Sequence, residues 1–327
     1  MARIKRILVA IKSPSSRGQV PLQKAAMLAR GADAKLLLFH AITQPLLMDA
    51  WSISGQTYEE VQVSWKATAM EQLEKLAKGL RETGLKVECD CAWDFPAYEA
   101  VVRAALKKKA DLIVAERTES RRLMPWLLRF NDWELIRRSP VPVLLVKRYA
   151  PWRKASVLAA IDPLHMFAKP AKLDAAILDQ ATLVADALDS PLHVVHAYPD
   201  APIALPLFGI PPEVGEPIEH RQPLIEARKA FERELGGRRI PKARRHLVPG
   251  RAMDVVPSMA KKLRAGIVVM GGVSRSGLKR LVIGNTAEQV LDALACDVLV
   301  LKPAEFKARV RERVRGPKLI ASSPAYI

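Results

Sequence analysis

The sequence is poor in cysteine, with only Cys89, Cys91 and Cys296 among its 327 residues. No CxxC pair occurs, and an odd number of thiols leaves at least one of them unbridged. On an extended strand Cys89 and Cys91 would lie on one face, two residues apart, where a disulfide is difficult to close. We therefore expect three small apolar side chains in a reducing compartment, the cytoplasm.

Long apolar runs are also missing. The N-terminal segment MARIKRILVAIKSPSS has too short an apolar stretch for a secretory signal. No segment reaches the roughly 18 uncharged apolar residues that a membrane-spanning helix needs. We expect neither export nor a membrane partner for this chain.

Recognisable catalytic and metal-binding motifs are absent as well. The six histidines form no HExxH pair, and His193 and His196 would face opposite sides of a strand. Neither a GxSxG nucleophile turn nor a complete phosphate-binding GxxxxGK[ST] loop occurs. His40 and His196 fall at equivalent strand ends, where a structural hydrogen bond is the first interpretation. The sequence thus predicts no metal site and no enzyme, and slow ATP hydrolysis stays open as an alternative.

Acidic residues are few relative to basic ones. Lys and Arg number 52 against 34 Asp and Glu, so the formal net charge is +18. A field of this sign attracts polyanions, and a nucleic-acid-associated protein is therefore the alternative class. The basic tail, 304–327, adds six Lys or Arg against two Glu, and we expect a solvated helix followed by disorder there.

What the sequence does contain is an internal repeat. Its residues are 50% hydrophobic but only 6% aromatic, which favours an aliphatic α/β core. Short apolar runs of the first half recur at a shift of about 150 to 156 residues, with helix-like segments between them. The matched runs are 7–11 with 157–161, 36–41 with 192–197, 107–116 with 261–271, and 139–148 with 295–303. The repeat predicts two domains, 1–149 and 152–303, joined by the link YAPWR.

Uninterrupted apolar runs are typical of parallel strands that helices cover on both faces. Right-handed crossovers then connect them, so each half is predicted to be a doubly wound parallel sheet of about five strands. Joining two copies in one chain raises their effective concentration. We expect the copies to pair as a pseudo-dimer through their closing runs, 141–146 and 298–301.

The clearest candidate site follows the strand-like run GIVVM in the second half. Gly271 begins the segment GGVSRSGLKRLVIGNTAEQVL, and Gly284-Asn285-Thr286 within it indicates the start of a helix. Glycine permits close approach to an anion, and unpaired amides at a helix start can hold phosphate. Taken alone, these residues fit an ordinary capped strand-to-helix turn equally well.

This segment and the closing run CDVLVLKP resemble a domain of the universal stress protein family. The family's nucleotide motif, Gly-x2-Gly-x9-Gly-(Ser/Thr/Asn), falls on Gly271, Ser274, Gly284 and Asn285. Ser274 replaces the second glycine, which adds a side chain where backbone should lie close to phosphate. The family's adenosine contacts fall on Asp162 and Ala197. The resemblance implies a fold like that of the adenine nucleotide alpha hydrolases, with ATP and Mg²⁺ as ligands of the second domain.

The first half departs further from this pattern. Lys12 stands where the family places Asp, and ERTESRR, 116–122, replaces the glycine segment. Arg117, Arg121 and Arg122 could attract an anion, although such a charge run is more often a solvated face. We expect this domain not to bind ATP.

A degenerate first domain beside a better preserved second one resembles the tandem universal stress proteins of the E type. The run FNDWELIRRSPVPVLLVK supports the closer match, and the resemblance covers residues 1 to about 303. It implies a cytoplasmic stress-response protein that acts by binding and regulation, with homodimerisation of the tandem chain left open.

Overall fold

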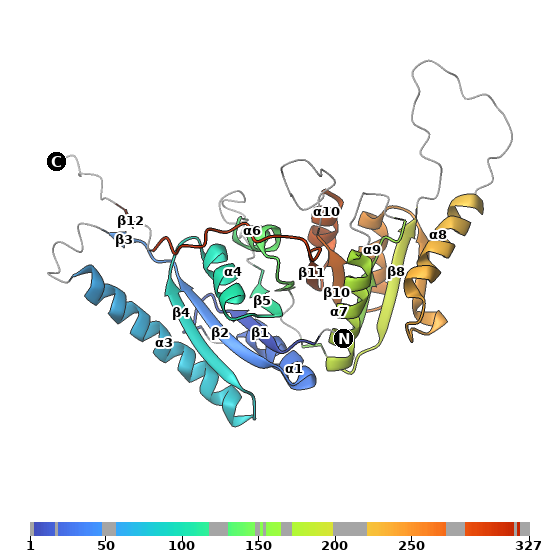
Figure 1. Cartoon of the computed structure of the whole chain (residues 1–327). Coiled ribbons are helices and arrows are strands. Elements are labelled where there is room, and N and C mark those ends of the chain that lie inside the picture. Colours follow the sequence, from blue (N-terminus) through green and yellow to red (C-terminus); the bar gives the residue numbers. More distant parts are fainter. Residues whose placement is uncertain are drawn as a thin grey trace, which may run out of the picture. The chain divides into compact units, whose positions relative to one another are not determined.

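The structure is a computed structural model. It describes residues 3–16, 19–47, 57–117, 130–147, 151–152, 155–164, 172–198, 221–272, 285–316 and 319–320. The chain divides into two compact units, and each is an α/β fold built around parallel strands (Figure 1). The first unit comprises Met1–Trp152, Asp186–Asp189 and Ala304–Ile327, and the second comprises Arg153–Ala185 and Ser190–Pro303.

Five strands of the first unit are parallel neighbours in the order β4-β2-β1-β5-β6. They are β1 (Arg6–Ala10), β2 (Lys35–Ile42), β4 (Val87–Trp93), β5 (Leu112–Glu116) and β6 (Val143–Val146). Their aliphatic residues form the core, and Ile7, Leu8 and Val9 of β1 are all 0% exposed. Continuous burial of this kind confirms that helices cover both faces of the strands.

The helices of the first unit are α1 (Val20–Ala32), α3 (Tyr58–Glu82), α4 (Ala97–Lys107) and α6 (Phe130–Arg138). α3 begins with a capping box, in which Glu60 N–H donates to Thr57 Oγ1 at 3.2 Å and Thr57 N–H donates to Glu60 Oε2 at 2.7 Å. α1 ends at Asp33, whose backbone turns left-handed. These signals set the helix boundaries locally.

The second unit repeats this arrangement in the order β11-β10-β7-β8-β9, again with parallel neighbours. Its strands are β7 (Ser156–Ala160), β8 (Leu192–Tyr198), β9 (Arg245–Pro249), β10 (Ala265–Gly271) and β11 (Asp297–Leu301). Its helices are α7 (Leu173–Ala187), α8 (Arg221–Leu235), the 3₁₀ turn η1 (Lys242–Arg244), α9 (Ala252–Lys262) and α10 (Asn285–Ala293). In each unit the strand order reverses beside the first strand, between β1 and β5 and between β7 and β10. The predicted doubly wound fold is therefore confirmed.

One predicted strand is shorter than expected. The run 139–148 contributes only β6, Val143–Val146. Pro140 and Pro142 precede it and cannot donate to a neighbouring strand, and the Ser139 hydroxyl donates to Val141 O at 2.7 Å. The turn therefore takes up the first residues of the run, and the strand begins only at Val143.

The C-terminal segment, residues 304–316, is not the solvated helix that its composition predicted. It contains no helix and is bound to the first unit. Arg309 N–H donates to Arg138 O at 3.3 Å, and Arg315 N–H donates to Asp94 Oδ1 at 3.0 Å. The Arg315 guanidinium also donates to Glu99 Oε1 at 2.8 Å. Farther on, β12 (Leu319–Ile320) pairs in parallel with β3 (Leu46–Leu47).

The physical reason for this correction lies in the first unit. Asp94 and Glu99 are 0% and 2% exposed, and two buried carboxylates need cationic partners. Arg103 of α4 supplies one and Arg315 supplies the other. In Figure 1 the C-terminal segment passes α6 and α4 before it reaches β12. A charge count along the chain could not reveal where these carboxylates would be buried.

Candidate functional site

Three of the residues predicted for a nucleotide lie at the carboxyl ends of neighbouring strands in the second unit. Asp162 follows β7, Gly271 ends β10, and Ala197 lies near the end of β8. β7 and β10 are parallel neighbours on either side of the point where the strand order reverses, and β8 is the other neighbour of β7. In open α/β sheets, ligands bind in the crevice outside the strands at such a point. The fold therefore brings these three residues to the expected edge.

Asp162 is positioned by a buried carboxylate that the sequence did not single out. Its backbone N–H donates to Asp174 Oδ1 at 3.1 Å, and Asp174 is 0% exposed in the first turn of α7. A carboxylate is favoured in the first turn of a helix by the helix dipole, and here it ties α7 to the end of β7. The only sequence signal for this role is an acidic residue near a helix start, which is too common to stand out.

Gly271 is a glycine for a packing reason. A Cβ atom there would lie 2.8 Å from Leu173 Cδ2 and 3.4 Å from Ile177 Cδ1, and both of these residues belong to α7. The first distance is too short for two carbon atoms, so α7 approaches β10 this closely because Gly271 has no side chain. Close packing thus accounts for the glycine without a phosphate, and its phosphate role stays a prediction.

The backbone beyond Gly271 is held from β11. Gly272 N–H donates to Leu301 O at 2.9 Å, and the Lys302 ammonium donates to Gly272 O. This contact places a cationic side chain at the same edge as Asp162. α10 begins at Asn285, as the sequence predicts, whereas Ser274 and Gly284 lie outside the described residues.

The two histidines at equivalent strand ends do have the predicted structural role. His40 Nδ1–H donates to Ile11 O at 2.7 Å, and His196 Nδ1–H donates to Ile161 O at 3.2 Å. Each bond joins the end of a unit's second strand to the backbone just beyond its first strand. His40 is buried, and this burial lowers the pKa of its imidazole. The two histidines fix the same edge in both units with the same hydrogen bond to backbone.

The corresponding edge of the first unit is occupied differently. Lys12 stands at the position of Asp162, and its ammonium donates to Glu116 O at 2.5 Å. Because Lys12 follows β1 and Glu116 ends β5, the side chain spans the point where the strand order reverses. Arg117 continues from β5 and donates its N–H to Val146 O at 2.9 Å. Arg121 and Arg122, the other candidates for an anion, lie outside the described residues.

A further pair of histidines lies on β8 and β9. His193 Nδ1 is 3.0 Å from His246 Nε2, and the rings stack with centroids 5.2 Å apart. Burial lowers the pKa of both imidazoles, and nearby positive charge lowers them further. His193 points away from the face on which His196 bonds Ile161, as the strand alternation predicts. Among the described residues, no three His, Cys, Asp or Glu side chains gather in a way that could hold a metal ion.

Comparison with known proteins adds an independent line of evidence. The model of the universal stress protein family matches residues 3–147 and again 157–302. Universal stress protein E of Escherichia coli K12 and that of Salmonella typhi are each 30% identical over 326 residues, which covers 95% of this chain and 98% of each relative. A crystal structure from Pseudomonas aeruginosa UCBPP-PA14, assigned to the universal stress proteins, has a TM-score of 0.70 at 28% identity and covers 93% of this chain and 95% of that one.

No helix within the described ranges combines the length and the apolar character needed to cross a bilayer.

Proposed function

The chain belongs to the universal stress protein family as a tandem of two family domains, and from this premise we propose that its second unit binds an adenine nucleotide. The observation that carries the proposal is the meeting of Asp162, Ala197 and Gly271 at the edge where the strand order reverses. The family is a stress-response family. The tandem chain is accordingly a stress-response protein, and nucleotide binding is its proposed means of regulation.

The proposed roles follow from the chemistry of each group. The Asp162 carboxylate would accept hydrogen bonds from ribose hydroxyls, and the backbone at Ala197 would lie against the base. Backbone N–H groups at Gly271, Gly284 and Asn285 would hold the phosphates at the start of α10, with the Ser274 hydroxyl as a further donor. Mg²⁺ would enter with the phosphates, because the polyphosphate itself supplies most of the oxygen ligands that this ion requires.

The first unit is proposed to bind no nucleotide. The Lys12 ammonium lies across the reversal point on Glu116 O, where the second unit has Asp162. A cation fixed on a carbonyl cannot accept a ribose hydroxyl as a carboxylate does. The expected asymmetry is therefore one nucleotide for each chain.

The test is isothermal titration of the full chain with ATP and Mg²⁺, together with native mass spectrometry. We expect one ATP per chain, with affinity at least tenfold lower in Asp162→Ala. Lys12→Ala is the matched control, because it truncates the equivalent residue of the first unit, and it should leave ATP affinity unchanged. A chain that binds no ATP, or equal losses in the two variants, would reject the proposal.

We further propose a binding role rather than catalysis, because the sequence lacks the motifs of known hydrolases. Incubation with ATP should release phosphate slowly or not at all. Turnover that Gly284→Trp abolishes would instead support the ATPase alternative.

A nucleic-acid role through the basic tail receives less support. The guanidinium of Arg315 is bound to Glu99, and the backbone of Arg309 is bound to Arg138. This segment is therefore part of the first unit rather than a solvated arm. Removing 304–327 would disturb these contacts, so a loss of polynucleotide binding after that deletion would not identify the tail as the binding element.

The cytoplasm remains the proposed compartment. All three cysteines are free, as expected where thiols stay reduced. Burial raises the pKa of Cys89 to about 12, so this thiol is a packing residue and not a reactive one.

A further inference from the structure

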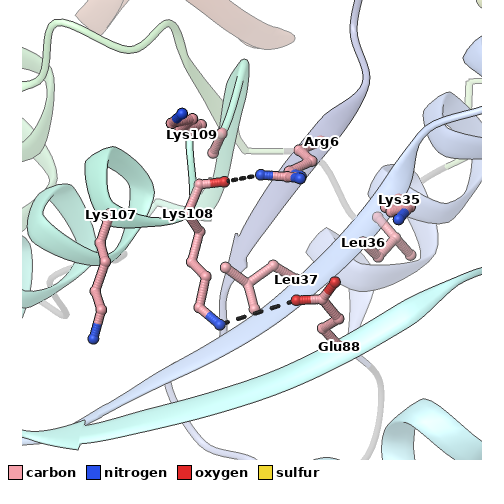
Figure 2. Close-up of a pocket in the computed structure, with 9 residues that line it drawn as sticks. Arg6, Lys35, Leu36, Leu37, Glu88, Lys107, Lys108 and Lys109 are labelled. Carbon is pink, nitrogen blue, oxygen red and sulfur yellow. Dashed lines mark hydrogen bonds and ion pairs between the residues drawn. The ribbon is translucent and has the colours of Figure 1, made fainter.

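A basic pocket lies in the first unit at the amino ends of its strands, the edge opposite to Lys12 and His40. Its volume is about 350 Å³, and five of the nine residues that line it are Lys or Arg, whereas one is acidic (Figure 2). The charged lining residues are Arg6, Lys35, Glu88, Lys107, Lys108 and Lys109. They come from the starts of β1, β2 and β4 and from the end of α4, so distant parts of the sequence converge on one space.

The fold holds the centre of this pocket in place. Arg6 Nη1–H donates to Lys108 O at 2.6 Å, which ties the first residue of β1 to the turn after α4 (Figure 2). The turn closes through a left-handed backbone at Lys109, with φ of 53°. Figure 2 shows Lys107 and Lys109 extending in different directions from Lys108, whose side chain crosses toward Glu88. The backbone of the basic turn is therefore fixed before any ligand arrives.

The end of α4 would ordinarily repel an anion, because unpaired carbonyls at a helix end carry partial negative charge. Here those carbonyls accept hydrogen bonds from the N–H groups of the following turn. Lys108 N–H donates to Ala104 O at 2.9 Å, Lys109 N–H to Leu106 O at 3.1 Å, and Ala110 N–H to Ala105 O at 2.8 Å. With Lys108 O bound to Arg6, the helix end contributes little negative potential, and the charged side chains decide the sign of the pocket.

Among the pocket lysines, the nearby acidic groups of the described chain pair only with Lys108, and the Asp111 carboxylate accepts the backbone N–H groups of Lys5 and Arg6 instead. Lys108 Nζ lies 4.0 Å from a Glu88 carboxylate oxygen and 3.9 Å from one of Asp90, both at the limit of an ion pair. Lys35, Lys107 and Lys109 are exposed and form no ion pair with any residue that the structure describes. The lining alone has five cationic residues and one anionic residue, a balance of +4.

The equivalent edge of the second unit shows that the fold does not require this charge. Ser156 begins β7 as Arg6 begins β1, and its hydroxyl donates to Leu263 O at 2.8 Å, just as Arg6 donates to Lys108 O. Leu263 and Lys108 each precede the left-handed residue after the helix, and Pro191 occupies the place of Lys35. Both units thus keep the hydrogen bond between the start of the strand and the turn. The cations Arg6, Lys35 and Lys108 have no cationic counterpart in the second unit.

We propose that this pocket is a binding site for a compact polyphosphate, either free or as the phosphate chain of a phosphorylated small molecule. A volume of about 350 Å³ falls within the range of roughly 300–1,000 Å³ typical of small-ligand sites. Cations that line a concave, partly apolar surface raise the positive potential inside it, and Leu36 and Leu37 provide the apolar wall. Phosphate oxygens are the acceptors that Lys and Arg side chains bind most readily at such a point.

The test uses inorganic tripolyphosphate as the probe, titrated into the full chain at low salt by calorimetry. The variant Lys35→Glu/Lys107→Glu reverses two exposed lysines of the pocket. Its matched control is Lys261→Glu/Lys262→Glu at the end of α9 in the second unit, where both lysines are exposed. Each change of Lys to Glu lowers the net charge by two, so both double variants have a formal net charge of +14 instead of +18. Far-UV circular dichroism should show both to be folded, because none of the four side chains is buried.

We expect one tripolyphosphate per pocket, with affinity at least tenfold lower in the first variant and changed less than twofold in the control. Glu88→Gln should strengthen binding about twofold to threefold, since it removes the acidic side chain from the lining. Equal weakening in both double variants would show a general field effect and overturn the proposal. A titration that neither variant changes would place the polyphosphate elsewhere, and it would overturn the proposal too.

A parallel titration with a 20-nucleotide single strand distinguishes nucleic acid from a small ligand. If the strand binds through Lys35 and Lys107 while tripolyphosphate does not bind, the pocket serves nucleic acid and the proposal fails. Binding of ATP through the same lysines, with no effect of Asp162→Ala, would identify a nucleotide as the source of the phosphate chain.

Discussion

The two units share one scaffold and differ at both edges of their strands. At the carboxyl edge, a histidine holds the backbone after the first strand in each, His40 on Ile11 and His196 on Ile161. Beside this common bond, the first unit has Lys12 on Glu116 O, and the second has Asp162 on Asp174. At the amino edge, a side chain at the start of the first strand donates to the turn that follows α4 or α9. The donor is Arg6 in the first unit and Ser156 in the second. Hydrogen bonds to backbone have been kept while the charges around them have changed.

The differences between the units show where this fold tolerates change. Bonds that fix the backbone serve folding in either unit and leave few alternatives. Side chains that point into solvent at the strand ends are free to specialise, because exchanging them costs little stability. The first unit thus carries exposed lysines at its amino edge, whereas the second carries the partly buried Asp162 at its carboxyl edge. Four experiments test whether the two units differ in this way.

The largest effect is expected from Arg315→Ala. Glu99 is 2% exposed and would lose its guanidinium partner at 2.8 Å, with Arg103 Nη1 remaining 3.8 Å away. We expect the first unit to lose about 2 kcal/mol, less than for a fully buried pair because Arg315 itself is partly exposed. All six tryptophans lie within Met1–Trp152, so their fluorescence during urea unfolding reports on the first unit.

Arg313→Ala is the matched control for this prediction. It removes the same side chain two residues earlier, from an exposed position that forms no hydrogen bond or ion pair with any described residue. Its unfolding transition should coincide with that of the unmodified chain. Equal shifts for the two variants would show that the contact with Glu99 contributes nothing to the first unit.

Gly271→Ala should destabilise the second unit by about 1–2 kcal/mol, because its new Cβ would meet Leu173 Cδ2 at 2.8 Å. Circular dichroism should detect the loss, and the tryptophan transition should not move. Adding Leu173→Ala should relieve the overlap, so the double variant should be more stable than the sum of the two single changes predicts. If Gly271→Ala lowered ATP affinity and left stability unchanged, the glycine would serve phosphate rather than packing.

Acidification should weaken the second unit through His193 and His246. Burial holds the pKa of each imidazole below its unfolded value of about 6.5, so the unfolded chain binds protons more readily. The stabilisation is fully present above that value and is lost as pH falls from it through the lowered pKa of the folded chain. We expect the urea midpoint of the second unit to fall between pH 7 and pH 5, by less than in Gly271→Ala.

The control for this pH effect is His246→Gln. It leaves one imidazole beside an uncharged partner, so the pH dependence of the second unit should become shallower. The first unit should also respond to acid through His40, whose pKa burial lowers. If the urea midpoint of the second unit did not change between pH 7 and pH 5, the result would contradict the prediction.

Lys12→Asp should have the smallest effect. It gives the first unit the side chain that the second has at Asp162 and removes the bond to Glu116 O. Because Lys12 is exposed, we expect a loss of less than about 1 kcal/mol in the tryptophan transition. ATP stoichiometry should stay at one per chain, since the segment after β5 lacks the glycines of the second unit. A second bound ATP would show that Lys12 alone closes the first site.

Much of the fold could be predicted from the sequence because short aliphatic runs and their repetition are local signals. The strands around Leu8 and Leu158, the helix beginning at Asn285 and the two histidine tethers all follow from residue type and position. The shortened β6 required the combined effect of Pro140 and Pro142 on backbone donors, which a hydrophobic run does not reveal.

The remaining features depend on contacts between distant residues. Asp174 resembles any acidic residue near a helix start until α7 packs on β7. Gly271 belongs to a phosphate motif in the sequence, whereas the structure shows it against Leu173. The basic pocket joins Arg6 to Lys108, residues 102 apart in the chain. Such pairs become visible only when the strand order is known.

The bond between Arg315 and Asp94 spans 221 residues, and this spacing has a consequence for synthesis of the protein. Ribosomes deliver the amino-terminal half first, so the interior carboxylate of Glu99 must wait for a counter-ion that lies 216 residues farther along the chain, whereas Asp94 already has Arg103. A chain released early would carry that defect into an otherwise finished domain. Synthesis as far as Arg315 therefore raises the stability of the part of the chain that was made first, and a protease that cleaves partly open molecules would detect the difference.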